Sequence, residues 1–413
     1  MSPITACRIC GNTHLVQVLS LGEQFLTGVF PHSRDERITC GPLELVKCHG
    51  ENACSLLQLA HSYDSAEMYG ANYGYRSGLN QSMVSHLRGK VENLLRVVSV
   101  RARDVVLDIG SNDGTLLSCY PEGPALIGMD PTAAKFISYY QERIKVIPDF
   151  FSADLFLSQF EGRKAKVITS IAMLYDLENP ISFVRQIASV LDPDGIWHFE
   201  QSYMPSMLKV NAYDTVCHEH VEYYGLKQIQ WMLDRCGLKI IDVEINDVNG
   251  GSFAVTAAHV SSRFDSNSST ASEALHAETA LGLETLAPYE AFAKRVAKHR
   301  DDLRAKLAEI AASGGRVLGY GASTKGNVIL QYCGLSADDI PAIAEVNPDK
   351  FGAFTPGTRI PIISEEEAHA RKPDYFLVMP WHFRENLLAR EKAFLEGGGK
   401  MLFPLPAIEV VSR

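Results

Sequence analysis

The densest group of side chains that could perform acid–base chemistry lies at residues 213–224, which read YDTVCHEHVEYY. Two histidines, two glutamates and two tyrosines fall within positions 218–224, which are too many titratable groups for a core strand. A histidine there could act as a general base, because its unperturbed pKa of about 6.5 leaves it largely neutral at pH 7. Adjacent carboxylates could orient its ring. Two alternatives are a zinc site on the H-x-H pair and a solvated surface loop.

A second chemical feature is the segment 104–117, DVVLDIGSNDGTLL, which predicts a buried strand, a glycine turn and a helix. Its spacing is D-x-G-x-x-x-G, and carboxylates stand where a dinucleotide site would receive a pyrophosphate. Such a turn favours a cation and ribose hydroxyls. The alternative is a similar turn in some other α/β protein.

Acids and an aromatic ring that follow the next two expected strands extend this candidate cofactor site. Asp130 ends the second strand, where such folds hydrogen-bond a ribose. Asp149 and Phe150 follow the third strand and could lie against an adenine, unless the phenylalanines there belong to the core. The candidate cofactor-binding residues are Asp108, Gly110, Asn112, Asp113, Gly114, Asp130, Asp149 and Phe150.

The N-terminal cysteines predict a structural metal. A C-x-x-C pair is followed, within a span rich in turn formers, by a looser C-x5-C pair. Four thiolates suit tetrahedral zinc, which stabilises a short segment that cannot bury its own core. Cys40, His14 or His49 could replace one ligand, and buried free cysteines are the alternative. The expected ligands are Cys7, Cys10, Cys48 and Cys54.

Composition limits the class of protein. A chain of 413 residues predicts two or three domains, and 46% hydrophobic with 21% charged residues is ordinary for a soluble globular protein. The net charge of -10 argues against nucleic-acid binding. The sequence has neither an apolar run of the roughly 20 residues that a membrane helix needs nor a signal segment. We therefore expect a cytoplasmic protein without a membrane partner, and the odd count of nine cysteines argues against a disulfide framework.

The order of expected elements indicates how these residues are positioned. Residues 104–260 alternate between strands and helices, which predicts a parallel, doubly wound sheet that binds ligands at the carboxyl ends of its strands. A helix is expected at 80–97, a serine-rich linker at 261–272 and a long amphipathic connecting helix at 287–312. The expected strands of this sheet are 105–109, 125–129, 145–147, 165–170, 195–200, 238–244 and 252–258.

Seven motifs together resemble the sugar C-methyltransferases of deoxysugar biosynthesis, in the family's order and over nearly the whole chain. They are YGYRSGLNQSM, VLDIGSNDGTLL, SIAMLYDLENP, EQSYMP, YDTVCHEHVEYY, VNGGSF and GYGASTKGN. The resemblance implies a zinc-binding domain at 1–66, a class I methyltransferase domain that uses S-adenosylmethionine at 67–260, and a linker helix with a Rossmann-like, substrate-holding domain at 261–413. Two departures are the widened second cysteine pair and Trp381-His382 in place of the more usual Trp-Asn, which we expect to affect only the tail.

The resemblance also implies a reaction, methyl transfer to C-3 of a nucleotide-linked 4-keto-6-deoxy sugar. A C-4 ketone acidifies the C-3 hydrogen, yet its removal still requires a placed base and a group that holds the enolate oxygen. By resemblance His220 is the base, Glu219 positions or polarises it, and Tyr75 and Tyr223 donate to the enolate or shuttle the proton. The nucleotide, whether dTDP, GDP or CDP, is not determined, and no obligate protein partner is expected. The expected substrate-binding residues are Tyr73, Arg76, Tyr175, Glu200, His218, Tyr224, Ser323 and Lys325.

A second glycine loop at 319–327, GYGASTKGN, follows an expected strand at 316–321. It motivates a rival hypothesis, an NAD-dependent oxidoreductase, although Thr324 stands where a dinucleotide motif has its third glycine. Its backbone amides, Ser323 and Lys325 could instead hold the pyrophosphate of a nucleotide-sugar, with a vestigial loop as the alternative. A third hypothesis is a zinc-dependent interaction module with an inactive methyltransferase-like body.

Overall fold

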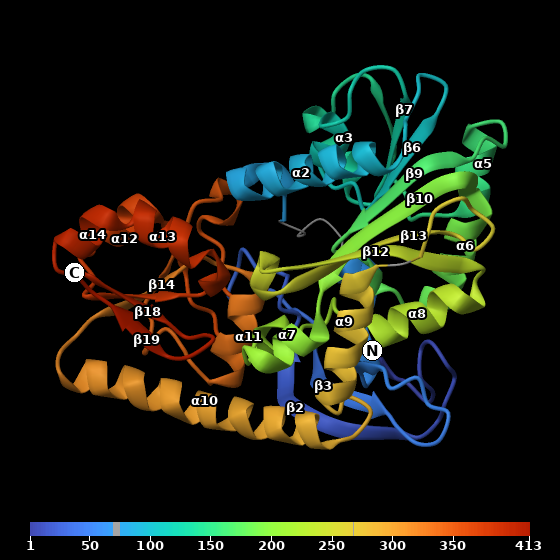
Figure 1. Ribbon diagram of the computed structural model, residues 1–413. Coiled ribbons are helices and arrows are strands. Elements are labelled where there is room, and N and C mark those ends of the chain that lie inside the picture. Colours follow the sequence, from blue (N-terminus) through green and yellow to red (C-terminus); the bar gives the residue numbers. More distant parts are fainter. Residues whose placement is uncertain (69–74, 267) are drawn as a thin grey trace.

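The protein has three main sheets: a four-stranded sheet from the N-terminal part of the sequence, a seven-stranded sheet from the middle and a six-stranded sheet from the C-terminal part (Figure 1). The computed structural model describes residues 1–68, 75–266 and 268–413. Among them, β1 (Ser2–Pro3) and β5 (His61–Ser62) form a separate antiparallel pair. No helix in these ranges combines the length and apolar composition needed to span a bilayer.

The seven-stranded sheet has the order β12-β13-β10-β9-β6-β7-β8. All seven expected strands are present, and the first two have the expected bounds. Five of the strands are parallel to one another. They are β6 (Val105–Ile109), β7 (Ala125–Met129), β8 (Ile144–Ile147), β9 (Ala165–Ile171) and β10 (Leu191–Ser202).

The prediction of a wholly parallel sheet is wrong at one edge. Strand β13 (Ser252–His259) is antiparallel to both β10 and β12 (Leu238–Asn246). Only a short turn that contains η5 (Val248–Gly250) joins β12 to β13. A parallel pair needs a crossover of about a dozen residues or more, so this connection allows only a hairpin.

Helices cover both faces of this sheet, as a doubly wound fold requires. On one face α2 (Gln81–Val97) buries Met83, Leu87 and Val91 in a cluster with Val106 of β6. This helix confirms the one expected at 80–97, and the Asn80 side chain caps it by accepting from Ser82 N. The other face is covered by α5 (Ala153–Gln159), α6 (Pro180–Val190) and α8 (Leu226–Arg235).

Shorter helices and turns surround these elements. The α-helices are α1 (Ser65–Met68), α3 (Thr115–Ser118), α4 (Ala133–Phe136) and α7 (Met204–Lys209). The 3-10 turns are η1 (Ser77–Leu79), η2 (Ile137–Tyr139), η3 (Leu174–Asp176) and η4 (Tyr213–Thr215).

The N-terminal sheet takes one strand from the titratable segment at 213–224. Its order is β11-β4-β3-β2, and β11 (Glu222–Tyr223) pairs antiparallel with β4 (Leu57–Leu59). The other strands are β2 (Leu15–Phe25) and β3 (Cys40–Cys48). The segment is therefore fixed to the N-terminal sheet at one end.

Two helices lead to the C-terminal domain. The long one, α10 (Ala287–Ala312), has the bounds that its amphipathic pattern predicts. The other, α9 (Ser269–Ala280), overlaps the expected linker at 261–272, so that prediction is partly wrong. Serine is common in linkers, but here Ser268 caps the helix by accepting from Ala271 N.

The C-terminal sheet has the order β16-β15-β14-β17-β18-β19, in which only β19 is antiparallel to its neighbour. The strands are β14 (Val317–Tyr320), β15 (Ile343–Glu345), β16 (Ile362–Ser364), β17 (Tyr375–Val378), β18 (Lys400–Phe403) and β19 (Glu409–Val411). The helices and turns are α11 (Thr324–Tyr332), α12 (Glu365–Ala370), α13 (Arg384–Arg390), α14 (Lys392–Glu396), η6 (Pro348–Lys350) and η7 (Trp381–Phe383).

One apolar core joins the two ends of the chain. It contains Leu19 and Leu21 of β2, Val296 and Leu303 of α10, and Leu318 of β14. Figure 1 shows α10 running along the molecule from β2 and β3 to the C-terminal sheet. The N-terminal sheet and the C-terminal domain therefore share a core across this helix.

Candidate functional site

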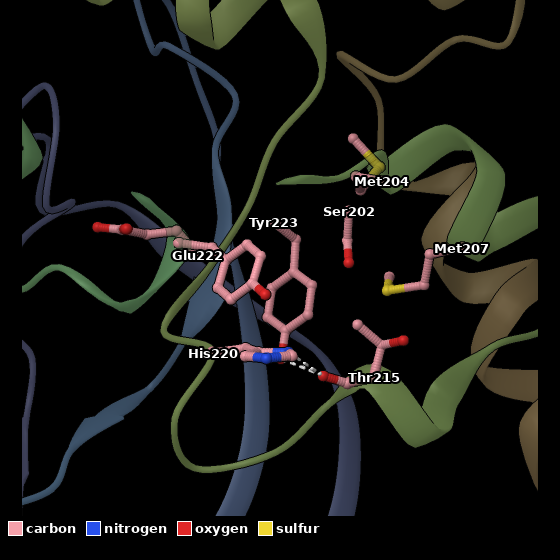
Figure 2. Close-up of a pocket in the computed structure, with 8 residues that line it drawn as sticks. Ser202, Met204, Met207, Thr215, His220, Glu222 and Tyr223 are labelled. Carbon is pink, nitrogen blue, oxygen red and sulfur yellow. Dashed lines mark hydrogen bonds between the residues drawn. The ribbon is translucent and has the colours of Figure 1, made fainter. Parts of the chain in front are cut away.

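A small closed cavity surrounds His220. Its volume is about 10 Å³, which is close to the space for one water molecule. Figure 2 shows the imidazole at one side of this group of side chains and two methionines at the other. The lining residues are Tyr175, Ser202, Met204, Met207, Thr215, His220, Glu222 and Tyr223.

The His220 ring is held in one tautomer. Nδ1 lies 2.9 Å from the backbone oxygen of Thr215, and a carbonyl only accepts, so Nδ1 carries the proton and Nε2 has the lone pair. The ring packs against Tyr175 with 4.2 Å between centroids. Burial and then the nearby Lys325 ammonium lower the pKa of His220 to about 3. The imidazole is therefore neutral and has a free basic nitrogen at physiological pH.

Tyr223 lies beside His220, and both side chains contact the backbone oxygen of Thr215. Its hydroxyl donates to the same Thr215 oxygen at 3.5 Å, and burial raises its pKa well above 10. The phenol therefore keeps its proton and is a hydrogen-bond donor. Figure 2 shows His220 and Tyr223 near one another, as the sequence predicts for two residues of one catalytic group.

The rest of the segment is buried, so the expectation that such titratable residues avoid the core is wrong. His218, Glu222 and Tyr224 are each at most 1% exposed. His218 packs edge-on against Tyr63 at 4.6 Å, and burial lowers its pKa to about 4. The Tyr224 hydroxyl donates to Glu222 at 3.0 Å. The surface-loop alternative does not hold, because partners from the N-terminal sheet enclose the segment.

Glu219 points away from the histidine that follows it. Its carboxylate accepts from the Thr27 hydroxyl at 3.4 Å, and burial raises its pKa. A Cβ added at Gly28 would lie 2.2 Å from Glu219 Oε1. In this structure the partner that orients the His220 ring is the Thr215 carbonyl, whereas Glu219 meets the N-terminal residues.

The first glycine loop, after β6, has the strand-turn-helix form that the sequence predicts. Gly110 and Gly114 have φ of 73° and 74°, a region that favours glycine. Asp130, at the end of β7, accepts from Asn112 N at 2.8 Å and from the Thr132 hydroxyl at 2.6 Å. Two polar residues of the loop are also engaged, as Asn112 accepts from Ser77 N and Asp113 accepts from Gly78 N, each at 2.9 Å. The loop thus fixes the chain that follows residue 74.

The other expected cofactor-site residues lie close to this loop. Asp108 is buried and accepts from the Thr169 hydroxyl at 2.6 Å, and burial raises its pKa to about 7. Asp149 accepts from the backbone N–H of Phe150 at 2.7 Å. Phe150 is 54% exposed, so it is not the core phenylalanine of the alternative interpretation, whereas Phe151 packs against Phe183.

Only some of the expected residues of the tyrosine-rich segment are among those that the structure describes. Tyr73 lies outside the described residues. Tyr75 is 52% exposed, and its backbone oxygen accepts from Asn112 at 3.1 Å. The Arg76 guanidinium lies 4.0 Å from the centroid of the Tyr139 ring and 3.8 Å from the Asp113 carboxylate. Among the described residues, Tyr75 and Arg76 therefore belong to the cofactor side and do not line the His220 cavity.

Glu200, an expected substrate ligand, is paired internally. It binds His86 at 2.6 Å and Lys90 at 2.7 Å, both on α2. Burial favours its neutral form, but the contacts with His86 and Lys90 outweigh burial and lower the pKa of Glu200 to about 2. This carboxylate attaches α2 to the sheet.

The second glycine loop, after β14, contacts other parts of the protein. Ser323 caps α11 by accepting from Gly326 N at 3.0 Å, and Lys325 donates to the backbone oxygen of Asn249 at 2.9 Å. Glu345, the acid at the end of β15, accepts from Ala322 N at 2.8 Å. Lys325 thus reaches from the C-terminal domain to the central one, close enough for its charge to lower the pKa of His220.

The four expected cysteines form one cluster. Their sulfur atoms all lie within 4.8 Å of one another, and the pairs Cys7 with Cys54 and Cys10 with Cys48 are 3.5 Å apart. Zinc–sulfur bonds of about 2.3 Å in a tetrahedron place the sulfurs roughly 3.8 Å apart, so this donor set fits zinc. Cys40 is exposed and lies outside the cluster. The four cysteines predicted as ligands thus come together, and among the described residues no histidine group forms a second such cluster.

Sequence reasoning missed several residues of the cavity and its support. Ser202, Met204 and Met207 line the cavity, but the first two lie in the EQSYMP motif, from which no individual role was predicted, and Met207 lies just after it. Trp381 is buried, and its indole Nε1 donates to Asp214 at 2.8 Å. The expectation that this position affects only the tail is therefore wrong.

Comparisons with known proteins agree with this architecture. Family models match residues 7–69 ("Putative zinc binding domain"), 83–243 ("Methyltransferase domain") and 247–406 ("C-methyltransferase C-terminal domain"). C-methyltransferase NovU of Streptomyces niveus is 31% identical over 99% of this chain and 97% of its own length.

Solved structures with a similar part include two further proteins. The plantazolicin methyltransferase BpumL in complex with SAH has a TM-score of 0.34 and 13% identity, covering 42% of this chain and 82% of its own. TnmH has a TM-score of 0.34 and 18% identity, covering 43% of this chain and 56% of its own.

Proposed function

The chain belongs to the C-methyltransferase family, and from that premise we propose that it methylates C-3 of a nucleotide-linked 4-keto-6-deoxy sugar with S-adenosylmethionine as methyl donor. The observation that carries the proposal is the neutral His220 ring, with Nδ1 bound to a carbonyl and Nε2 free in a closed cavity. The oxidoreductase hypothesis loses its basis, because residues 247–406, which contain the second glycine loop, match the model of the C-methyltransferase C-terminal domain.

The proposed chemistry begins with proton transfer to His220 Nε2. The C-3 hydrogen leaves as a proton, and the electron pair of the C–H bond moves toward the C-4 oxygen to form an enolate. Tyr223 retains its proton and can donate it in a hydrogen bond to that oxygen. The developing negative charge opposes the effect of burial and favours the imidazolium.

S-adenosylmethionine, when bound, supplies an electrophilic methyl group, and the carbon–carbon bond forms as the sulfur–methyl bond breaks. We place it at the first glycine loop, where Asp130 lies at the end of β7 and Phe150 is exposed. Tyr75, half exposed beside that loop, is a candidate to shuttle the proton. Glu219, which faces Thr27, is a candidate to contact the sugar from the N-terminal side.

Substrate entry requires the cavity to enlarge, because a space for one water cannot hold a sugar ring. Met204 and Met207 form part of its wall, and methionine side chains adapt readily through three rotatable bonds. We propose that the nucleotide is held on the side of Lys325, whose ammonium suits a diphosphate.

We also propose three domains, at 1–66, 67–260 and 261–413. The three family-model matches, at 7–69, 83–243 and 247–406, support a division into three parts, and the place of β13 in the central sheet favours a last boundary after residue 259. The segment 213–224 lies in the central domain by sequence, yet its strand β11 pairs with the N-terminal sheet. The proposed active site therefore forms only where all three domains meet.

The test incubates the protein in D₂O with S-adenosylmethionine and a panel of dTDP-, GDP- and CDP-linked 4-keto-6-deoxy sugars. We expect one sugar to gain the mass of one methylene group, and its C-3 hydrogen to exchange with solvent when the donor is omitted. Both C-3 and C-5 are adjacent to the ketone, so NMR must locate the deuterium. Exchange at C-5 would overturn the assignment of C-3 as the methylated carbon, but methyl transfer through an enolate of the C-4 ketone would still stand.

The variant His220→Ala should lose exchange by about 10²-fold or more, because general-base catalysis contributes about that much. S-adenosylhomocysteine should still raise its melting temperature. His276→Ala, at an exposed histidine of α9, is the control and should exchange at the wild-type rate. Exchange in His220→Ala at the control rate would contradict the assignment of the base.

A further inference from the structure

The short turn η4 (Tyr213–Thr215) supplies the carbonyl that orients the base, and residues from the C-terminal domain hold that turn. We infer that Trp381 and Asp214 are positioning residues for His220: the indole of the C-terminal domain fixes the turn whose last carbonyl binds the imidazole. This inference rests on the proposed function, since it deepens the role of the same site.

The link between the C-terminal domain and the turn is a buried hydrogen bond. Trp381 Nε1 donates to Asp214 Oδ2 at 2.8 Å, across 167 positions of sequence. Asp214 is fully buried and Trp381 is 7% exposed. A buried carboxyl that loses its donor is costly, so this bond strongly favours one position of the turn.

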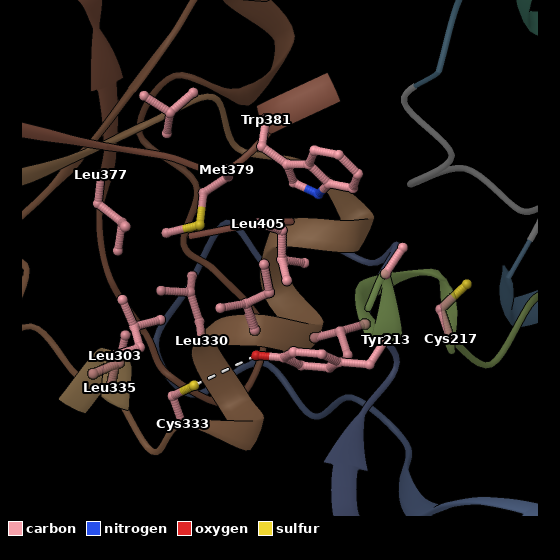
Figure 3. Close-up of a cluster of buried hydrophobic side chains, with 14 of the residues drawn as sticks. Tyr213, Cys217, Leu303, Leu330, Cys333, Leu335, Leu377, Met379, Trp381 and Leu405 are labelled. Carbon is pink, nitrogen blue, oxygen red and sulfur yellow. Dashed lines mark hydrogen bonds between the residues drawn. The ribbon is translucent and has the colours of Figure 1, made fainter. Parts of the chain in front are cut away.

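The residue before Asp214 is held by the C-terminal domain as well. The Tyr213 hydroxyl donates to His299 Nδ1 at 3.1 Å, since His299 Nε2 is bound to the Pro404 carbonyl at 2.6 Å. The same hydroxyl lies 3.7 Å from Cys333. Figure 3 shows the Tyr213 ring extending from its turn toward Cys333.

The position of Trp381 is itself fixed from the central domain. A Cβ added at Gly250, in the turn between β12 and β13, would lie 3.1 Å from the indole ring. Lys325 donates to Asn249 in that turn. The indole is thus packed against one turn of the central domain while it donates to another, which limits its movement.

The consequence for the base follows from the third residue of the turn. The Thr215 carbonyl accepts from His220 Nδ1 at 2.9 Å and from the Tyr223 hydroxyl at 3.5 Å. If the turn rotates, this acceptor moves, Nδ1 loses the partner that keeps its proton, and Nε2 no longer aims at one point. A misplacement of about 1 Å can cost on the order of 10²-fold in rate.

The experiment removes the indole donor and keeps an aromatic ring, in the variant Trp381→Phe. The matched control is Trp197→Phe, which removes another buried indole donor, the one bound to Ser170 at 2.9 Å in the central sheet. Both proteins are labelled with ¹⁵N-histidine, and the His220 signals are assigned from their absence in His220→Asn. Nitrogen shifts report the tautomer, and exchange of the sugar hydrogen in D₂O gives kcat and KM.

We expect Trp381→Phe to show a mixture of His220 tautomers and a kcat for exchange at least tenfold lower, with KM and S-adenosylhomocysteine affinity nearly unchanged. Trp197→Phe should lower the melting temperature but keep the wild-type tautomer and kcat. Asp214→Asn, which retains an acceptor oxygen for the indole, should keep most of kcat, whereas Asp214→Ala should behave as Trp381→Phe does.

Identical tautomer and kcat in Trp381→Phe and Trp197→Phe would overturn the inference. Loss of S-adenosylhomocysteine binding would show that Trp381→Phe does not fold. In that case Asp214→Asn is compared with Asp214→Ala, and an equal loss of kcat in these two variants would overturn the inference. If the wild-type protein acts on no sugar of the panel, the proposed function fails, and the tautomer measurement still tests whether Trp381 positions the ring.

Discussion

The first glycine loop, after β6, and the second, after β14, are built alike around a carboxylate on the neighbouring strand. Asp130, at the end of β7, accepts from Asn112 N at 2.8 Å, and Glu345, at the end of β15, accepts from Ala322 N at the same distance. Both loops contain a glycine with positive φ, Gly114 at 74° and Gly321 at 83°.

They differ in what packs against them, although in each loop a glycine faces a ring of its own domain: a Cβ at Gly114 would lie 2.6 Å from the Tyr140 ring. A Cβ at Gly321 would lie 2.6 Å from the Pro380 ring and one at Gly326 would lie 2.6 Å from Met379, so the second loop is closed by its own domain. In the first loop, Asn112 and Asp113 bind the chain at 77–78. A glycine-rich turn therefore indicates close backbone approach, and the approaching group can be protein as readily as ligand.

The largest expected difference between the loops is in cofactor binding. Asp130→Ala should weaken S-adenosylhomocysteine binding by about 100-fold or more, because it removes a ribose acceptor and releases the Asn112 amide. Glu345→Ala should leave that affinity within about twofold. Its cost should instead be stability, since three backbone N–H groups lose an acceptor, each worth about 1–3 kcal/mol when buried. Calorimetric titration measures the affinity for S-adenosylhomocysteine, and thermal melts measure stability. An equal loss of affinity in Asp130→Ala and Glu345→Ala would contradict the expected difference between the loops.

Alanine at the two positive-φ glycines should give a smaller contrast. Each substitution is expected to cost about 1–3 kcal/mol of stability from backbone strain. Gly114→Ala also brings Cβ to 2.6 Å from the Tyr140 ring, whose hydroxyl binds Ser111 and the Asn112 backbone, so binding of S-adenosylhomocysteine should weaken about tenfold. Gly321→Ala should lower the melting temperature without that effect. Unchanged binding in Gly114→Ala would show that Tyr140 does not support the cofactor site.

The smallest expected effect concerns Lys325 of the second loop, whose positive charge lies close enough to lower the pKa of His220. A neutral His220 is required, and its pKa of about 3 keeps it neutral at any pH well above that value. Lys325→Met removes a cation that disfavours the imidazolium, so the pKa should rise and the acidic limb of kcat/KM should move to higher pH. Lys392→Met, at an exposed lysine of α14, is the control. A limb near pH 6.5 in the wild-type protein would show that neither burial nor Lys325 acts as described.

Local sequence signals predicted the elements, because hydrophobic period and turn residues act over short distances. The strands at 105–109 and 125–129 and the helix at 287–312 are confirmed, and the four cysteines predicted as zinc ligands form one cluster. The direction of β13 was not predictable from its own residues, since a buried strand has the same pattern in either direction. The short turn between β12 and β13 was the available signal for an antiparallel pair. It outweighs the alternation of strands and helices, which favoured a parallel sheet.

The support of the site could not be predicted, because it depends on contacts between distant residues. The bond from Trp381 to Asp214 spans 167 positions, and that from Thr27 to Glu219 spans 192. The crowding of titratable groups at 218–224 predicted a chemically active segment and not a core strand, with a surface loop as an alternative, yet most of the segment is buried. Composition alone does not show which partners enclose a polar segment.

The core that joins the two ends of the chain constrains the order in which the protein can fold during synthesis. Leu19 and Leu21 pack with Leu303 and Leu318, which are translated nearly three hundred residues later. At a translation rate of about 5–20 residues per second, the apolar face of β2 stays uncovered for roughly 15–60 s until the helix that covers it has been synthesised. Such long-range contacts form slowly and leave strands open to aggregation. We therefore expect truncation within α10 to leave the N-terminal sheet insoluble, because its apolar face then has no cover.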